Sequence, residues 1–230
     1  MKNKLSVVIA AYNEETRIAK VLEVVEHHPL IDEVIVVNDG SADKTSDVVR
    51  KFDVKLIEND QNMGKTLSVK RGIEASKNDI IMLLDADLKG LTADAIDKLA
   101  RPVLDGNVDW TLSIRKNSAG FMRLFKMDWI SGERVAPKKM LLDPLIWSRP
   151  DIGYGLETLM NKSFLENGAS FQSVYLPSVY ITRKSEKIGF WQGIRDDVKM
   201  IKSICKVIPF RQMVAQFITM ARLNGKRKVN

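Results

Sequence analysis

The sequence contains little cysteine and histidine, and it lacks a long hydrophobic run. Its 230 residues include a single cysteine, Cys205, which cannot form a disulfide within the chain. No uninterrupted stretch of about 18 apolar residues occurs, so a membrane-spanning helix is not expected. Residues 1–4 lead into a strand-like segment without a signal-peptide core, which with the lone cysteine predicts a cytoplasmic location. The only histidines, His27 and His28, end one predicted helix, so histidine catalysis is not expected.

Aromatic residues are also few, at 7% of the chain, and they rarely alternate with basic residues. This composition argues against nucleic acid as a partner, although the net charge is +7. The charge is unevenly divided, because residues 1–100 carry 14 Lys and Arg against 18 Asp and Glu, whereas residues 101–230 carry 22 against 11. The basic second half predicts a surface that faces anionic lipid or an anionic substrate.

The first hundred residues alternate between strand and helix patterns. Four short apolar runs predict strands at residues 5–11, 33–39, 54–60 and 79–85. Between them, Ile18, Leu22 and Val25 form one helical stripe, and Ser41 or Asp43 can cap a second helix. The predicted fold class is α/β, with a mostly parallel central sheet flanked by helices and a helical C-terminal segment. Ligands of such sheets bind beyond the carboxyl ends of the strands.

Polar side chains follow each of the four predicted strands. They are Asn13 and Glu14, Asn38 and Asp39, Asp60 and Asn62, and Asp85 and Asp87. Hard divalent cations take oxygen ligands, and Mg²⁺ commonly uses one or two carboxylates together with substrate phosphates. The pair at the end of "IIMLLDADLKG" therefore favours a metal-diphosphate site. An isolated Asp-x-Asp is more typical of a strand-end Asp followed by a loop or a helix-capping Asp, so the metal site depends on the surrounding motifs.

Four motifs in this order resemble the family 2 glycosyltransferases: "VVIAAYNEE", "VNDGSADKT", "NMGKTLSVKRG" and "LLDADL". Later segments, "SGERVAPKKML" and "GYGLETLMN", resemble the acceptor side of the dolichol-phosphate mannose synthase type and related soluble members. The resemblance implies a GT-A fold over residues 1–205. Within it, residues 1–117 would bind the nucleotide sugar and residues 118–205 the acceptor, and residues 206–230 would form a basic amphipathic helix and tail.

The resemblance also implies a donor site for a UDP- or GDP-hexose and a divalent metal, Mg²⁺ or Mn²⁺. Its nucleotide-sugar-binding residues would be Ala11, Tyr12, Asn13, Glu14, Asp39, Gly64, Lys65, Asp85 and Ala86. Tyr12 would meet the base and Glu14 the ribose, although Glu14 also suits a helix start. Asp39 would accept a hydrogen bond from the base. The residues of "NDGS" are also all turn formers, so the segment could form a turn instead or as well. Lys65 would meet a phosphate, but the frame is not that of a Walker loop.

The catalytic residues implied are Asp85, Asp87 and Glu157, with Asp87 as the metal ligand and Glu157 as the base for a hydroxyl acceptor. Arg115 and Arg134 match the family's acceptor-phosphate arginines, and they could equally be surface charges. Related sequences use a later histidine as a further metal ligand, where Thr182 stands here. Metal binding would then be weaker, be completed by water, or matter less than the motif suggests.

The predicted function is transfer of a hexose to a polyprenyl phosphate or another phosphorylated acceptor. The alternatives are a small-molecule or glycan hydroxyl acceptor, or nucleotide-sugar binding without transfer. Residues 121–130 mix aromatic and basic residues, and Phe210, Met213, Val214, Phe217 and Ala221 form one stripe of the last helix. Both patterns suit peripheral contact with the inner face of the membrane, but a buried helix is the commoner explanation for residues 121–130, and packing in the core suits the last helix equally well.

Overall fold

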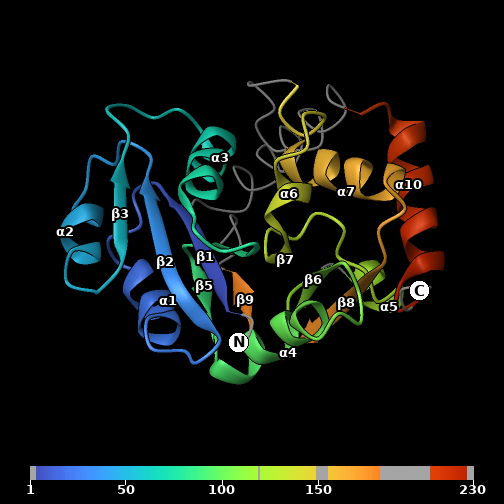
Figure 1. The fold of residues 1–230 in the computed structure, drawn as a ribbon, viewed down its shortest axis with the longest axis horizontal. Helices are drawn as coiled ribbons and strands as arrows, with labels where there is room; N and C mark the ends of the chain where they lie inside the picture. Colours follow the sequence, from blue (N-terminus) through green and yellow to red (C-terminus); the bar gives the residue numbers. More distant parts are fainter. Residues whose placement is uncertain (1–3, 119, 149–154, 182–207, 227–230) are drawn as a thin grey trace.

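The structure, a computed structural model, describes residues 4–118, 120–148, 155–181 and 208–226. Figure 1 shows a central twisted sheet with helices on both faces. Within the described residues, no helix has both the length and the apolar character needed to cross a membrane.

A seven-stranded sheet forms the centre, and it confirms the predicted fold class. Its order is β3 (Lys55–Glu58), β2 (Ile31–Asn38), β1 (Leu5–Ala11), β4 (Ile80–Asp85), β7 (Arg134–Pro137), β6 (Trp110–Arg115) and β8 (Phe171–Leu176). The pairs from β3 to β4 are parallel, β7 is antiparallel to both of its neighbours, and β6 pairs parallel with β8. The carboxyl ends of all strands except β7 therefore lie on one edge.

Alternate side chains of the strands enter two cores, one on each face of the sheet. Leu5, Val7 and Ile9 of β1 pack with α1 (Ile18–Val25), α2 (Thr45–Val49) and α4 (Ala93–Leu104), and Val8 packs on the opposite face. The second core is covered by α3 (Lys65–Ala75), α6 (Lys138–Leu141), α7 (Leu156–Glu166) and α10 (Phe210–Leu223). A short pair, β5 (Leu88–Lys89) with β9 (Tyr180–Ile181), and the helix α5 (Gly120–Leu124) complete the described elements.

The four predicted strands of the first half are all present: β1 has the predicted bounds, β2 begins two residues earlier and ends one residue earlier, and β3 and β4 are shorter. The predicted stripe of α1 is confirmed, since Ile18, Leu22 and Val25 are fully buried. The run 54–60 yields the four-residue strand β3, which lies at the edge of the sheet in the part of the chain that the structure describes. Helix α2 begins at Thr45, and its amide donates to the predicted capping residue Asp43 at 3.0 Å.

The apolar stripe predicted for the last helix lies at the boundary between a packed and an exposed side of α10. Gln216 and Met220 lie on the buried side of α10, with Met213, Phe217 and Ala221 packed beside them. The other two members, Phe210 and Val214, are exposed. The helix therefore has a packed face and a separate exposed apolar flank, because its inward side is centred on Gln216 and Met220, which the prediction did not include.

Candidate active site

The polar strand ends predicted from the sequence do converge on one edge. The register places Ala11 beside Asn38, Asn38 beside Glu58, and Asp85 beside Ala10. Arg115 ends β6, and Arg134 begins the antiparallel β7, so both join this edge from the second half of the chain. A single edge thus carries the predicted donor-side and acceptor-side residues.

Lys65 bridges the two halves of this edge. Its Nζ donates to Asp85 Oδ1 at 2.8 Å and to Glu157 Oε1 at 3.1 Å, from the first residue of α3 to the end of β4 and the first turn of α7. Partial enclosure by the protein opposes the charge on Lys65, yet the neighbouring carboxylates of Asp85 and Glu157 raise its pKa. Burial likewise opposes ionisation of Asp85, and Lys65 and Arg115 nevertheless lower its pKa. The ammonium therefore acts as an internal counter-ion.

Arg115 lies on the other side of Asp85, inside a buried acidic cluster. Its Nη1 is 3.8 Å from Asp85 Oδ2 and 3.2 Å from Glu133 Oε1, and its Nη2 is 3.5 Å from Asp128 Oδ2. Burial works against the charge of Arg115, but the three carboxylates raise its pKa. Within the described structure, Arg115 Nε and Asp128 Oδ1 are buried without a hydrogen-bond partner. The guanidinium is thus held beside Asp85, and its Nε makes no hydrogen bond to a described residue.

Serine hydroxyls complete this cluster. Ser113 and Ser131 both donate to Glu133 Oε2 at 2.6 Å, and Ser118 donates to Asp128 Oδ2. Glu133 and Asp128 are almost fully buried. A buried carboxylate is costly unless it is paired and hydrogen-bonded, and both conditions are met at Glu133 and at Oδ2 of Asp128.

Arg134 lies deeper, beneath the edge. It is fully buried, and its three nitrogen groups donate to Ser131 O at 2.9 Å, Asn161 Oδ1 at 2.6 Å and Trp129 O at 3.1 Å. Burial lowers the pKa of the guanidinium to about 10, so it stays charged at neutral pH. These contacts link β7 to α7. To bind an acceptor phosphate, Arg134 would have to give up one of these three hydrogen bonds. Its role in acceptor binding stays a prediction.

The predicted nucleoside pocket is built from two interlocked loops. Asn13 has a φ of 55°, its amide donates to Ser41 Oγ at 3.0 Å, and its Oδ1 accepts from the Ala42 amide at 2.9 Å. Asparagine is among the few residues that tolerate this left-handed conformation. Glu14 accepts from Arg17 Nε, whereas the Tyr12 side chain is 47% exposed. The ring of Tyr12 is therefore the accessible group of this loop.

Asp39 ties the β2 loop to the start of α3. Its Oδ1 accepts from Asn59 Nδ2 and the Met63 amide, each at 2.8 Å, and its Oδ2 accepts from the Gly64 amide at 2.9 Å. The side chain is buried, and Gly64 has a φ of 89°, which glycine adopts without strain. Asp39 thereby fixes the backbone that precedes Lys65. Its predicted contact with a base would add to these bonds.

The donor atoms at this edge fit a hard divalent cation. Asp85 and Asp87 offer carboxylate oxygens, and a Cβ on Gly132 would lie 2.8 Å from both oxygens of Asp85, so only glycine leaves this carboxylate room. The pKa of Arg17 is raised mainly by its hydrogen bond to Glu14, and the charge of Asp87 contributes to the increase. No three His, Cys, Asp or Glu residues of the described chain could hold a metal unaided. Diphosphate oxygens or water would complete the coordination.

Several important residues were not singled out in the sequence. Glu133, Asp128 and Gly132 surround Arg115 and Asp85, although Glu133 and Gly132 lie in the quoted segment "SGERVAPKKML". Their roles depend on β7 inserting between β4 and β6, which no local pattern indicates. The histidines lie elsewhere: His27 is largely exposed, and the buried His28 contacts Ala93 O. Thr182 falls outside the described residues.

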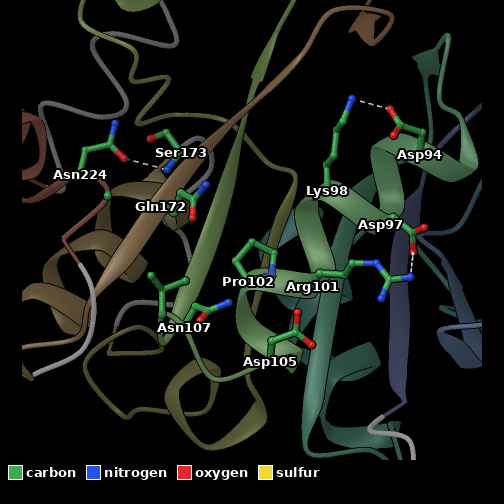
Figure 2. Close-up of a pocket in the computed structure, with 12 residues that line it drawn as sticks. Asp94, Asp97, Lys98, Arg101, Pro102, Asp105, Asn107, Gln172, Ser173 and Asn224 are labelled. Atoms are coloured by element: carbon green, nitrogen blue, oxygen red, sulfur yellow. Dashed lines mark hydrogen bonds and ion pairs between the residues drawn. The ribbon is translucent and has the colours of Figure 1, made fainter. Parts of the chain in front are cut away.

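A larger hollow lies at the opposite edge of the sheet. Its volume is about 790 Å³, and it is bordered by α4, the amino end of β8 and the turn after α10 (Figure 2). Lys98 and Arg101 pair with Asp94 and Asp97 on their own helix. None of the predicted site residues lines the hollow, so it is separate from the site described above.

The sheet with its acidic edge defines the class of protein, an α/β fold of the GT-A glycosyltransferase type. Glucosyl-3-phosphoglycerate synthase of Mycobacterium tuberculosis, solved with Mn²⁺, UDP-glucose and phosphoglyceric acid, shares this fold at a TM-score of 0.68 and 22% identity, covering 89% of this chain and 79% of that one. The sequence profile of Glycosyl transferase family 2 matches residues 6–163. The chain belongs to this family.

Two curated relatives are similar over shorter stretches. An uncharacterised protein of Methanocaldococcus jannaschii is 36% identical over 119 residues, which are 47% of this chain and 51% of that protein. A dolichyl-phosphate beta-glucosyltransferase, ALG5A, of Trichomonas vaginalis is 33% identical over 97 residues, which are 36% of this chain and 30% of that protein. The chain thus spans about half or less of the length of these relatives.

Proposed function

We propose that this protein transfers a hexose from a UDP- or GDP-hexose to a polyprenyl phosphate or another phosphorylated acceptor, with the help of Mg²⁺ or Mn²⁺. The observation that carries the proposal is the bridge from Lys65 to Asp85 and Glu157, with Arg115 beside Asp85, at the strand ends of a family 2 chain. The positively charged side chains of Lys65 and Arg115 lie at the junction of the predicted donor and acceptor halves. Two such charges suit a reaction between phosphorylated molecules.

On the donor side, each group has a distinct task. The exposed ring of Tyr12 stacks on the base, and the ribose lies against Glu14. Asp39 holds the Gly64 backbone, so that Lys65 can leave its carboxylate partners for a donor phosphate. Ala11 and Ala86 have small side chains that let the nucleotide approach the strand ends.

Asp87 and Asp85 would hold the divalent ion against the diphosphate, where it supplies Lewis-acid stabilisation of the leaving group. Lys65 adds a positive charge to the same oxygens. The bond from the anomeric carbon to the diphosphate oxygen breaks, and its electron pair leaves with the nucleoside diphosphate. An oxygen of the acceptor forms the new bond to that carbon.

The acceptor side favours a phosphate nucleophile. A phosphate monoester has a second pKa of about 6 and is already an oxyanion at neutral pH, so no protein base is required. Glu157, the candidate base for a hydroxyl acceptor, is already engaged by Lys65. Arg115 has a buried, unpartnered Nε among the described contacts and suits a phosphate. The names of the similar proteins are consistent with this choice, since they mention dolichyl phosphate and phosphoglyceric acid.

We place the protein at the cytoplasmic face of the membrane as a peripheral protein, because the lone cysteine suits a reducing compartment and the second half is basic. The functional division into residues 1–117, 118–205 and 206–230 belongs to the same proposal.

The test is a transfer assay with purified protein. UDP- and GDP-hexoses are combined with Mg²⁺ or Mn²⁺ and with a polyprenyl phosphate, 3-phosphoglycerate or a glycan, and the product is identified by mass spectrometry. We expect a glycosylated phosphate and loss of product in Asp87→Asn. A product on the glycan alone would favour the hydroxyl alternative. Nucleotide-sugar binding without any product would favour a binding protein, and absence of both binding and product would refute the proposal.

A further inference from the structure

One face of the molecule exposes large apolar side chains that no described residue covers. At the end of α5, Leu124 is 77% exposed and Phe125 is 53% exposed. On α10, Phe210, Val214 and Ile218 are 63%, 40% and 42% exposed. We call these five residues the α5–α10 face, and both helices lie on the right side of Figure 1.

The α10 part of this face is a continuous stripe. Phe210, Val214 and Ile218 are spaced by four residues, so they share one side of a helix with 3.6 residues per turn. The helix is anchored through a different side, where Gln216 Nε2 donates to Thr158 O at 3.0 Å and Met220 is buried. The stripe therefore contributes little to the core, and its exposure has a cost that packing does not offset.

The α5 and α10 parts adjoin one another. The rings of Phe125 and Phe217 meet edge to face, with centroids 5.5 Å apart. Asn224, just after α10, donates to Lys126 O at 2.9 Å and accepts from the Ser173 amide at 2.8 Å. Beside this junction is a mostly apolar hollow of about 600 Å³, whose lining residues are Ile114, Arg123, Leu124, Lys126, Ser173 and Tyr175.

The charges around this face have one sign. Arg123 and Lys126 are exposed on the α5 side, and Arg211 and Arg222 are exposed on α10. Neither residues 110–127 nor residues 208–226 contain an aspartate or glutamate. A second copy of the chain would bring these basic groups against one another, which disfavours a symmetric dimer through this face.

We infer that the α5–α10 face docks on an anionic lipid bilayer. The apolar side chains enter the interfacial region, the hollow accommodates a lipid chain, and the four basic groups meet lipid phosphates. The inference rests on the proposed function only in that a lipid-linked acceptor would be met at the same bilayer.

The test is sedimentation of the full chain with vesicles of phosphatidylcholine, with and without phosphatidylglycerol. We expect binding only to the anionic vesicles, and weaker binding at high salt, because salt screens exposed charges. The double variant Val214→Asp/Ile218→Asp should lose about tenfold or more in vesicle affinity, because it places acidic side chains on the apolar stripe. The variant Arg211→Gln/Arg222→Gln should also lose about tenfold or more.

The matched control is Ala215→Asp/Thr219→Asp, which makes the same charge change at exposed positions elsewhere on α10. Equal loss of binding in this control, or no binding by the unaltered protein, would overturn the inference. So would a dimer in analytical ultracentrifugation that Val214→Asp/Ile218→Asp dissociates.

The proposed function is tested separately, by nucleotide-sugar binding and by transfer to a short-chain acceptor without vesicles. Both should be unchanged in the Val214→Asp/Ile218→Asp variant. Transfer without vesicle binding would leave the proposed transfer reaction standing and would refute both the docking face and the peripheral location. Vesicle binding without nucleotide-sugar binding would support the docking face and refute the proposed transfer reaction.

Discussion

The two sides of the candidate site are built differently. On the donor side, exposed loops fix one another through hydrogen bonds such as those from Asn13 to Ser41 and from Gly64 to Asp39. On the acceptor side, Arg115 is held by the buried carboxylates of Glu133 and Asp128. The predicted donor side therefore depends on backbone shape, whereas the predicted acceptor side depends on charge balance, so the two should respond to different mutations.

The largest effect should come from Arg115→Met. It leaves Glu133 and Asp128 buried without their cation, and removal of one partner of a buried ion pair typically costs about 3–5 kcal/mol. We expect a loss of this size in the free energy of unfolding, measured by urea denaturation. The double variant Arg115→Met/Glu133→Gln should recover part of it, because one buried charge is removed. A loss below about 1 kcal/mol would mean that the cluster tolerates an uncompensated charge.

Gly40→Ala should perturb the donor side through shape alone. Gly40 has a φ of 68°, and an added Cβ would lie 2.5 Å from the Gln61 backbone carbon. Gly106→Ala is the matched control, since Gly106 has a φ of 73° and nothing lies within 4 Å of its added Cβ. The control should cost about 1–2 kcal/mol, the penalty of the left-handed conformation, and Gly40→Ala should cost more. Equal losses would show that the two loops do not need their close approach.

Lys65→Met should separate binding from stability. The Lys65 side chain is 44% exposed, so loss of its ion pairs should change unfolding by less than about 1 kcal/mol. Binding of Mn²⁺ alone should strengthen, because Asp85 and Glu157 lose their internal cation, while binding of the metal–nucleotide sugar should weaken by about tenfold. Isothermal titration calorimetry measures both, with Lys65→Arg as the charge-conserving control. Unchanged Mn²⁺ affinity would contradict the counter-ion role.

The same contrast explains what could be predicted from the sequence. Strands β1 to β4 are short apolar runs that each end in polar residues, and parallel pairing alone brings those residues together. The setting of Arg115 depends instead on β7, which begins at Arg134 and carries Glu133 beside β6. Four residues of antiparallel strand leave no clear periodicity, so the buried acidic cluster was not predicted.

The smallest effect should be a change in the pH dependence of stability in Asp43→Asn. Burial opposes ionisation of Asp43, but hydrogen bonds from Thr45 and from the Glu15 amide lower its pKa below the ordinary value. A lowered pKa in the folded state contributes stability above the unfolded-state pKa of about 4, and that contribution is lost as the pH falls through the folded-state value. Asp43→Asn should therefore unfold more readily than the unaltered protein at neutral pH, and the gap should close in acid. Thermal unfolding across the acidic range measures it, and a gap that widens in acid would show that Asp43 does not stabilise the donor loops through its charge.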